Sequence, residues 1–422
     1  MKLCHFSLQA DVTMQDDFLP LHKSPWVLYP NQEFADPERR HQMFNNVLDE
    51  LELSSSLGID GVCVNEHHSS LYAVTPCPNL YASALARSTT DTAILVLGNS
   101  IIARGNPIRL AEEYAFIDCL SGGRLVAGLP VGAPMDVNHL MGVVPSTTRP
   151  RFREAVDMMV QGWTRPGPFP FNGRFYKERY VNPDPLPMQK PHPPIWCLGA
   201  ESVDTWEYAA NHDYAYGFFS FYGQEFGEAG LNEFWQTAEA CGRDRNPYRV
   251  AFLQMICLSE TDEATEEEYA DHVFYLFDKE QTTPRYLADP PGYKLERSLA
   301  KKDTGRSGAE RLREARDSML PTEGLTRTER WRRFVENNVV LAGSPETVRT
   351  KLRAMAERLN VGHLLCLFQM GSLPHDQTMR NIKLFCEEVL PYVRDIHDDT
   401  EWVDHWWPQG AKQKIVAAAA SS

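Results

Sequence analysis

The chain has 422 residues, of which 43% are hydrophobic and 23% are charged, a composition typical of a globular enzyme with a large core. Its formal net charge of -15 argues against nucleic acid or an anionic membrane as a partner, because both attract basic surfaces. The sequence shows neither an apolar run long enough to span a membrane nor the apolar leader of a signal peptide. We therefore expect a cytoplasmic protein.

Short apolar runs alternate with longer helical patterns, which is typical of βα units and a parallel sheet. In the first half of the chain, strands are predicted at residues 3–8, 61–65, 93–102 and 124–129. Helices are predicted at residues 37–57, 79–89, 107–119 and 152–163, and Pro107 stands at a first helical position that tolerates proline. The length of the chain fits one (β/α)8 barrel enlarged by insertions, or two or three smaller domains.

The second half repeats the alternation less regularly. Strands are predicted at residues 195–198, 214–219, 250–258 and 362–368, and the last helix is predicted at residues 376–394. Ser344 and Pro345 are typical of the cap and first turn of another helix. The proline-rich stretch at residues 183–194 is interpreted as a surface loop, because a strand follows it at once.

One long segment, residues 278–329, breaks the alternation and is dense in charges, glycines and prolines. A stretch of this length inside a compact domain is usually a functional lid or a disordered loop. We interpret it as a lid insertion over the active site, with a disordered loop as the alternative.

The nine cysteines are scattered from Cys4 to Cys386 and form no CxxC pair. This spacing argues against a zinc ribbon and against thioredoxin-like redox chemistry. Most of the cysteines have apolar neighbours, as Cys63 has in the run from Gly61 to Val64. We expect them to be reduced core residues, and we predict no metal site.

Glu66, His67 and His68 follow directly after the predicted second strand, and barrel active sites gather at such strand ends. Successive side chains of an extended chain point to opposite faces, so His67 should face away from Glu66 and His68. This disfavours joint metal binding by the two histidines and favours one histidine acting as a general acid or base in a pocket. The alternative is a set of polar residues that satisfy hydrogen bonds at the barrel rim.

Distinctive runs of residues lie at the predicted strand and helix ends: Val64 to His68, Asn106 to Glu113, Asp118 to Arg124, Ala342 to Val348 and Gly371 to His375. In number, order and spacing, these runs resemble the motifs of the bacterial-luciferase family of flavin-dependent monooxygenases. The resemblance covers the chain from Lys2 to about Arg394. It implies a single (β/α)8 TIM barrel with insertions over residues 1–400, followed by a C-terminal extension at residues 401–422.

The resemblance also implies roles for individual residues. His67 matches the histidine beside the reactive edge of the flavin and is the predicted catalytic residue. Gly98 and Asn99 fall where the family backbone runs along the isoalloxazine ring. The predicted cofactor-binding set is completed by Glu66, Gly132, Glu201, Ser202 and Thr205.

The run from Glu201 to Thr205 resembles the phosphate-binding turn that the family places at the start of a helix. Hydroxyls and free backbone N–H groups at a helix N-terminus favour a dianionic phosphate. From the residues alone, Ser202 or Asp204 would be interpreted as a helix cap. The resemblance favours the phosphate site.

The end of the predicted fourth strand departs from the family pattern. Luciferase itself has a Cys-Arg-Gly run there, whereas this chain has Pro130 and Val131 in place of the thiol and the cation. Light emission is therefore not expected, and oxygenation of another organic molecule is. Phosphate binding is expected to depend on backbone N–H groups and on hydroxyls or other arginines, the candidates being Ser202, Thr205, Arg149 and Arg151.

The implied function is that of a monooxygenase that uses reduced FMN and O2 to hydroxylate, or insert oxygen into, a small organic substrate. No GxGxxG fingerprint follows a strand, so a separate NAD(P)H:flavin reductase is expected to supply FMNH2. We expect a homodimer. Two alternatives remain open: an F420-dependent oxidoreductase of the same superfamily, and a non-catalytic flavin-binding subunit.

Overall fold

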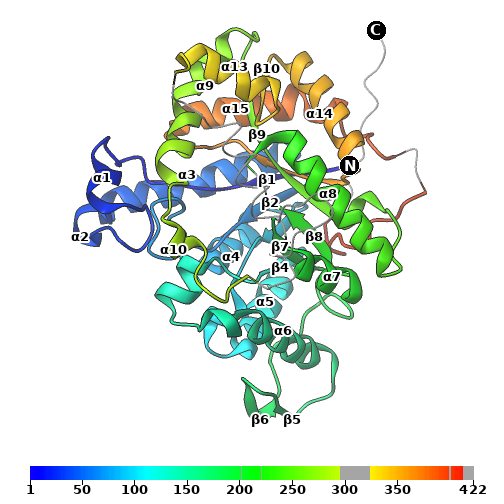
Figure 1. Cartoon of the computed structure of the whole chain (residues 1–422). Helices are drawn as coiled ribbons and strands as arrows, with labels where there is room; N and C mark the ends of the chain where they lie inside the picture. Colours follow the sequence, from blue (N-terminus) through cyan, green and yellow to red (C-terminus); the bar gives the residue numbers. More distant parts are fainter. Residues whose placement is uncertain (201, 220, 295–323, 399–400, 412–422) are drawn as a thin grey trace.

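The computed structural model describes residues 1–200, 202–219, 221–294, 324–398 and 401–411. Within these residues, eight parallel strands close into a barrel, because the last strand in the series pairs back with the first (Figure 1). The strands are β1 (Lys2–Phe6), β2 (Gly61–Val64), β3 (Ala93–Val96), β4 (Leu125–Pro130), β7 (Ile195–Gly199), β8 (Ala215–Phe218), β9 (Val250–Leu258) and β11 (His363–Leu367). The strand β10 (Val340–Gly343) pairs with the carboxyl half of β9. The predicted TIM barrel is confirmed.

Helices surround the barrel and pack side by side around it. This outer layer consists of α3 (Pro37–Ser56), α4 (Pro78–Ser88), α5 (Pro107–Ser121), α6 (Thr148–Thr164), α7 (Val203–His212), α8 (Gly223–Ala240), α14 (Pro345–Leu359) and α15 (His375–Glu388). Shorter or additional helices are α1 (Phe18–His22), α2 (Asn31–Phe34), α9 (Ala264–Tyr275), α10 (Arg285–Ala288) and α13 (Arg327–Glu336). No helix among the described residues is long and apolar enough to cross a membrane.

The strands are apolar on both faces, because both faces are covered. Alternate residues of β3 illustrate this: Leu95 belongs to the cluster that fills the barrel, and Ile94 and Val96 belong to the cluster between strands and helices. Helix starts were recognisable from their caps. The side chains of Asn106 and Ser344 accept hydrogen bonds from the first helical turn, and a proline follows each of them.

Some predicted elements need correction. The strand predicted at residues 93–102 ends at Val96, and Ile101–Arg104 is a 3-10 helix. Ile101 and Ile102 are apolar because they are buried in the core between strands and helices, so their apolarity was a signal of burial and not of a strand. The helix predicted at residues 376–394 ends at Glu388.

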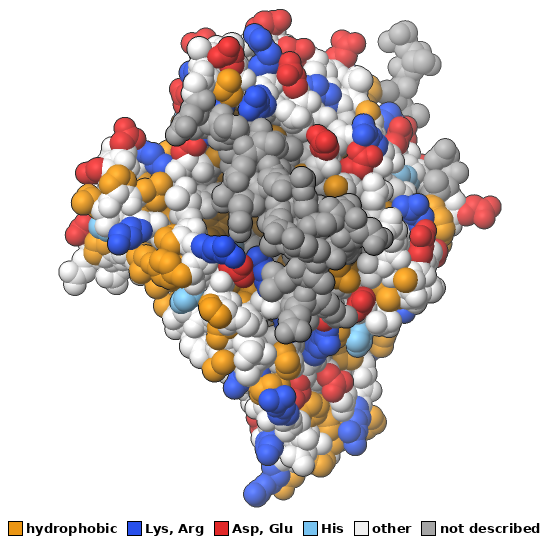
Figure 2. Space-filling model, in the orientation of Figure 1, with side chains coloured by type: hydrophobic (Ala, Val, Ile, Leu, Met, Phe, Trp, Pro, Cys, Tyr) orange, Lys and Arg blue, Asp and Glu red, His pale blue; other side chains and the backbone are white. Residues whose placement is uncertain are grey.

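A hairpin was not predicted: β5 (Phe169–Asn172) and β6 (Lys177–Val181) form an antiparallel pair that projects from the barrel (Figure 1). The side chain of Glu154 accepts hydrogen bonds from the backbone of Arg174, Phe175 and Tyr176 and so fixes the turn. On the face shown in Figure 2, basic side chains gather at this tip, whereas acidic and basic side chains are interspersed elsewhere.

The chain segment at residues 401–411 packs against the amino ends of the barrel strands. Trp196 at the start of β7 donates to the carbonyl of Trp406 at 3.1 Å, and the ring of Trp407 stacks on His363 at the start of β11. Gly410 donates to the carbonyl of Gly123, just before β4, at 2.7 Å. This segment therefore covers the end of the barrel opposite the site described below.

Candidate functional site

A cavity of 550 Å³ lies at the carboxyl ends of the barrel strands, where parallel barrels place their active sites. Its walls come from the segments that follow β1, β2, β3, β4, β7 and β8, and from the start of α6 and α7. Tyr293 and Lys294 also line it, and they belong to the segment predicted as a lid. Residues 295–323 of that segment lie outside the described part of the chain.

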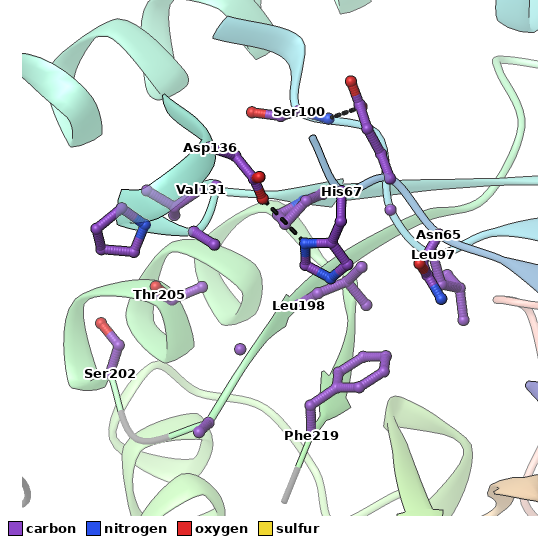
Figure 3. Close-up of a pocket in the computed structure, with 18 of the residues that line it drawn as sticks. Asn65, His67, Leu97, Ser100, Val131, Asp136, Leu198, Ser202, Thr205 and Phe219 are labelled. Carbon is purple, nitrogen blue, oxygen red and sulfur yellow. Dashed lines mark hydrogen bonds and ion pairs between the residues drawn. The ribbon is translucent and has the colours of Figure 1, made fainter. Parts of the chain in front are cut away.

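His67 lies in the middle of the labelled cavity residues, with Asp136 on one side and Phe219 on the other (Figure 3). Its Nδ1 lies 2.9 Å from Oδ2 of Asp136. A carboxylate only accepts hydrogen bonds, so Nδ1 carries the proton and Nε2 is the acceptor of the neutral ring. Among the described residues, Nε2 has no hydrogen-bond partner, and the side chain lines the cavity. His67 can therefore take up or release a proton at Nε2.

Glu66 and His68 pair with each other, and both side chains also line the cavity. Oε1 of Glu66 lies 2.7 Å from Nε2 of His68, and Oε2 accepts from the backbone N–H of Ser100 at 2.7 Å. The hydrogen bond that His68 donates to Glu66 raises the pKa of His68, and burial opposes that rise. Asp136 joins the two pairs, because its Oδ1 accepts from the backbone N–H of His68 at 2.9 Å. In the described residues, no cluster of His, Cys, Asp and Glu is suited to a metal ion.

Gly98 and Asn99 follow β3, and the structure places them differently. Gly98 lines the cavity, and a Cβ atom there would lie 2.2 Å from Cδ of Pro130, so only glycine fits. Asn99 is fully buried and is not among the residues that line the cavity. Its amide donates to Asn79, and its Oδ1 accepts from Arg104 at 2.8 Å. Asn99 thus stabilises the wall of the cavity without lining it.

The end of β4 gives the cavity an apolar wall. Pro130 and Val131 line the cavity at the positions where the sequence departs from the luciferase pattern, and Gly132 lines it beside them. Gly132 has a φ of 106°, and a Cβ atom there would lie 2.5 Å from Cγ1 of Val137. Its carbonyl accepts a hydrogen bond from the hydroxyl of Tyr293 at 2.7 Å. No cation comes from this strand end, so positive charge must reach the cavity from other elements.

Arg149, Ser202 and Thr205 form a polar end of the cavity at the N-terminus of α7. Arg149 donates to Oγ1 of Thr205 at 3.0 Å, and its Nε has no partner among the described residues. Ser202 is the N-cap of α7, yet its side chain makes no capping hydrogen bond, and its buried Oγ is likewise unpaired within residues 1–200, 202–219, 221–294, 324–398 and 401–411. Glu201, also predicted to bind the cofactor, lies outside the described residues. Arg151 packs over Phe175 and does not line the cavity.

Aromatic side chains form the wall around His67. The ring of Tyr72 meets His67 edge to face at 5.4 Å between centroids, and the ring of Trp26 lies 5.7 Å from His67. The rings of Phe6 and Phe219 meet edge to face with 5.2 Å between their centroids, and both side chains line the cavity. The two ends of the cavity therefore differ: one is cationic and rich in hydroxyls, and the other has aromatic side chains around His67, with Glu66 and His68 also in the lining.

Sequence analysis did not identify Asp136, Tyr293, Trp26 or Tyr72 as site residues. Asp136 carried one signal, because it is a carboxylate between the apolar Met135 and Val137 shortly after a predicted strand. A buried acid in that place usually has a partner. The three aromatic residues carried no signal beyond their type.

Comparison with known sequences identifies similar oxygenases. A family model described as luciferase-like monooxygenase matches residues 21–361. The oxygenase component of the flavin-dependent trigonelline monooxygenase of Acinetobacter baylyi is 26% identical over 183 residues, which are 43% of this chain and 50% of that protein. The match thus spans about half the length of this curated relative.

Two solved structures share the fold. The oxygenating constituent of 3,6-diketocamphane monooxygenase from Pseudomonas putida, in complex with FMN, has a TM-score of 0.65 and 20% identity, over 83% of this chain and 93% of that one. An F420-dependent secondary alcohol dehydrogenase, in complex with an F420-acetone adduct, has a TM-score of 0.60 and 15% identity, over 94% of this chain and 99% of that one.

Proposed function

Because the chain belongs to the luciferase-like monooxygenase family, we propose that it is the oxygenase of a two-component system, which takes up reduced FMN and transfers one oxygen atom from O2 to a small organic substrate. The relative from Acinetobacter baylyi is itself named as an oxygenase component, and the diketocamphane enzyme holds FMN. A separate NAD(P)H:flavin reductase would supply the reduced flavin.

The unpaired polar atoms at the N-terminus of α7 carry this proposal. Oγ of Ser202 and Nε of Arg149 are buried without a partner in the described part of the chain, and each such atom costs free energy unless a ligand satisfies it. A phosphate monoester suits them, since it accepts several hydrogen bonds and favours the positive end of a helix. We assign the phosphate of FMN to Ser202, Thr205 and Arg149.

The flavin ring would lie along the wall between the polar end and His67. Oδ1 of Asn65 and Oγ of Ser100 are buried on this wall and have no partner in the portion of the chain that the structure describes, and they suit the polar edge of a flat heterocycle. At Gly98 no side chain projects from the wall, and any side chain there would collide with Pro130. The residues present therefore fit a flavin mononucleotide.

Reduced FMN supplies the two electrons that activate O2 when it is bound. The chain itself positions the reactants, excludes water and controls one proton. Asp136 holds the His67 ring so that Nε2 faces the cavity and can donate or accept that proton. Phe6, Trp26 and Tyr72 line the same region and keep water away from it.

An F420-dependent hydride transfer is the second candidate, because a dehydrogenase of that kind has the same fold. The two functions differ in the cofactor that binds and in the use of O2. Anaerobic titration of the protein with reduced FMN and with reduced F420 separates them, with quenching of tryptophan fluorescence as the signal, because Trp26 lines the cavity.

The test of the proposed function is turnover with photoreduced FMN and O2. The substrate panel consists of pyridinium carboxylates and bicyclic ketones, the classes to which the substrates of the named relatives belong. We expect a product with one added oxygen atom, detected by mass spectrometry. Tight binding of reduced F420, with O2-independent reduction or oxidation of a substrate, would replace the monooxygenase proposal by the second candidate.

A further inference from the structure

The segment at residues 285–294 reaches the polar end of the cavity and is fixed there by several contacts. The hydroxyl of Tyr293 donates to the carbonyl of Gly132 at 2.7 Å, and burial raises the pKa of Tyr293, so the phenol keeps its proton at neutral pH. The guanidinium of Arg149 lies over the Tyr293 ring, 5.7 Å from its centroid. Gly292 lies against Ser146, the residue that comes shortly before α6.

The next residue, Lys294, lines the cavity beside this anchor. Its ammonium lies 3.1 Å from Oδ2 of Asp289, within the same segment. Both side chains are partly exposed, at 33% for Lys294 and 21% for Asp289. An ion pair of this kind is weak, because water screens it. The ammonium is therefore free to change partners at little cost.

The positive charge at the polar end of the cavity is too small to neutralise a phosphate dianion. Arg149 and Arg153 both contact the carboxylate of Asp204, and two cations against one anion leave one net positive charge among these described residues. A phosphate monoester carries about 1.5 to 2 negative charges at pH 7. The end of β4 lines the cavity with Pro130 and Val131 and supplies no cation, so the second cation has to come from another element.

We infer that Lys294, presented by the Tyr293 anchor, is a second phosphate-binding cation of the reduced-FMN site. This inference rests on the proposed function. On binding, the ammonium of Lys294 leaves Asp289 for a phosphate oxygen, and Arg149 contributes the other charge. Tyr293 fixes the backbone of the segment against the end of β4. Binding therefore requires only rotation of the Lys294 side chain, without movement of the backbone.

The experiment measures the Kd of reduced FMN and of reduced riboflavin anaerobically, for the full-length protein and three variants. Lys294→Gln should weaken FMN binding about tenfold, the typical effect of one hydrogen bond to a charged group, and should leave riboflavin binding unchanged because riboflavin has no phosphate. Lys294→Arg should bind FMN within about twofold of the wild type, since it keeps the charge. Asp289→Asn should tighten FMN binding about two- to fivefold, because it removes the competing carboxylate.

Lys279→Gln is the matched control, because Lys279 forms a similar pair with Asp16 at 2.9 Å and does not line the cavity. Equal losses of affinity for FMN and riboflavin in Lys294→Gln would overturn the inference. A loss of FMN affinity in Asp289→Asn would also overturn it. Both results are expected if the ion pair between Lys294 and Asp289 only stabilises the fold. Unchanged FMN binding in Lys294→Gln would also overturn it. A wild-type protein that binds neither reduced flavin would instead refute the proposed function.

Discussion

At the scale of single residues, two neighbouring histidines of the site each pair with a different carboxylate. His67 is paired with Asp136, whose Oδ2 lies 2.9 Å from Nδ1, and His68 is paired with Glu66 at 2.7 Å. In the first pair, Nε2 of His67 has no hydrogen-bond partner among the described residues, whereas in the second pair Nε2 of His68 is bonded to Glu66, although both histidines line the cavity. The same sequence motif thus leaves one ring nitrogen open for the proposed proton transfer and holds the other in an ion pair.

His67→Ala should lower product formation by roughly 100- to 10,000-fold, the usual cost of removing a general acid or base. Reduced flavin should still be oxidised, and hydrogen peroxide should be released in place of product. His139→Ala is the control, because His139 is exposed and does not line the cavity. Near-normal product yield from a folded His67→Ala variant would remove His67 from the mechanism.

The Glu66–His68 pair should make stability depend on pH. Glu66 raises the folded-state pKa of His68 above 6.5, so the pair stabilises the fold fully below about pH 6.5 and loses this effect as the pH rises through the folded-state pKa. The free energy of unfolding of the wild type should therefore exceed that of Glu66→Gln by on the order of 1 kcal/mol near pH 6, and by less near pH 9.

Urea unfolding at the two pH values measures this difference. The Gln side chain still accepts a hydrogen bond from the backbone of Ser100, so the comparison isolates the charge. If the difference in the free energy of unfolding between the wild type and Glu66→Gln grows with pH, the pKa of His68 is not raised in the folded state. That result would contradict this interpretation.

Part of the site could be predicted from the sequence, because some residues lie next to one another in local motifs. His67, Ser202 and Thr205 stand at strand and helix ends that were recognisable, and all three line the cavity. Their cofactor roles stay predictions. Asp136 could not be paired with His67, because 69 residues separate them and only the barrel brings the ends of β2 and β4 together. The place of Tyr293 likewise depends on a contact with Gly132 across 161 residues.

At the scale of elements, the N-terminus of α7 differs from an ordinary capped helix start, and this difference supports the proposed phosphate site. Ser344 caps α14 with its side chain, as serine usually does, whereas Ser202 does not cap α7. The difference leaves a hydroxyl of Ser202 beside Arg149 and Thr205 at the polar end of the cavity.

Replacing Ser202 and Thr205 together by alanine should weaken the binding of reduced FMN more than tenfold, because each hydrogen bond to a charged phosphate contributes about 1.5–3 kcal/mol. Reduced riboflavin should bind the wild type and the double variant alike. Thr205→Ser serves as the control, since it keeps the hydroxyl that accepts from Arg149. Unchanged FMN binding in the double variant would move the phosphate to another part of the cavity.

The barrel strands were predictable because each one is an apolar run bounded by helices with recognisable caps. The prediction for β9 was right at both ends. The hairpin β5–β6 was missed because its strands are short and largely exposed, so they lack the alternation of a half-buried strand. The strand β10 (Val340–Gly343) was also missed, although it is as long and as buried as β2, β3 and β8, which were predicted. The predicted lid at residues 278–329 stays a prediction.

At the scale of the whole molecule, the proposed oxygenase depends on a source of reduced flavin. Its sequence contains no GxGxxG fingerprint after a strand, and the cavity at the carboxyl ends of the barrel holds the polar and aromatic groups already described. Reduced flavin should therefore come by diffusion from another protein. The homodimer stays a prediction as well.

The most direct test of this account is the incorporation of 18O from 18O2 into the substrate panel, with NADH and FMN present, in two tubes. The first tube holds the protein alone, and the second also holds a heterologous reductase that releases free reduced FMN. We expect product with one 18O atom in the second tube and none in the first. Substantial labelled product in the first tube, with contaminating reductase excluded, would contradict the account and would mean that the chain reduces its own flavin.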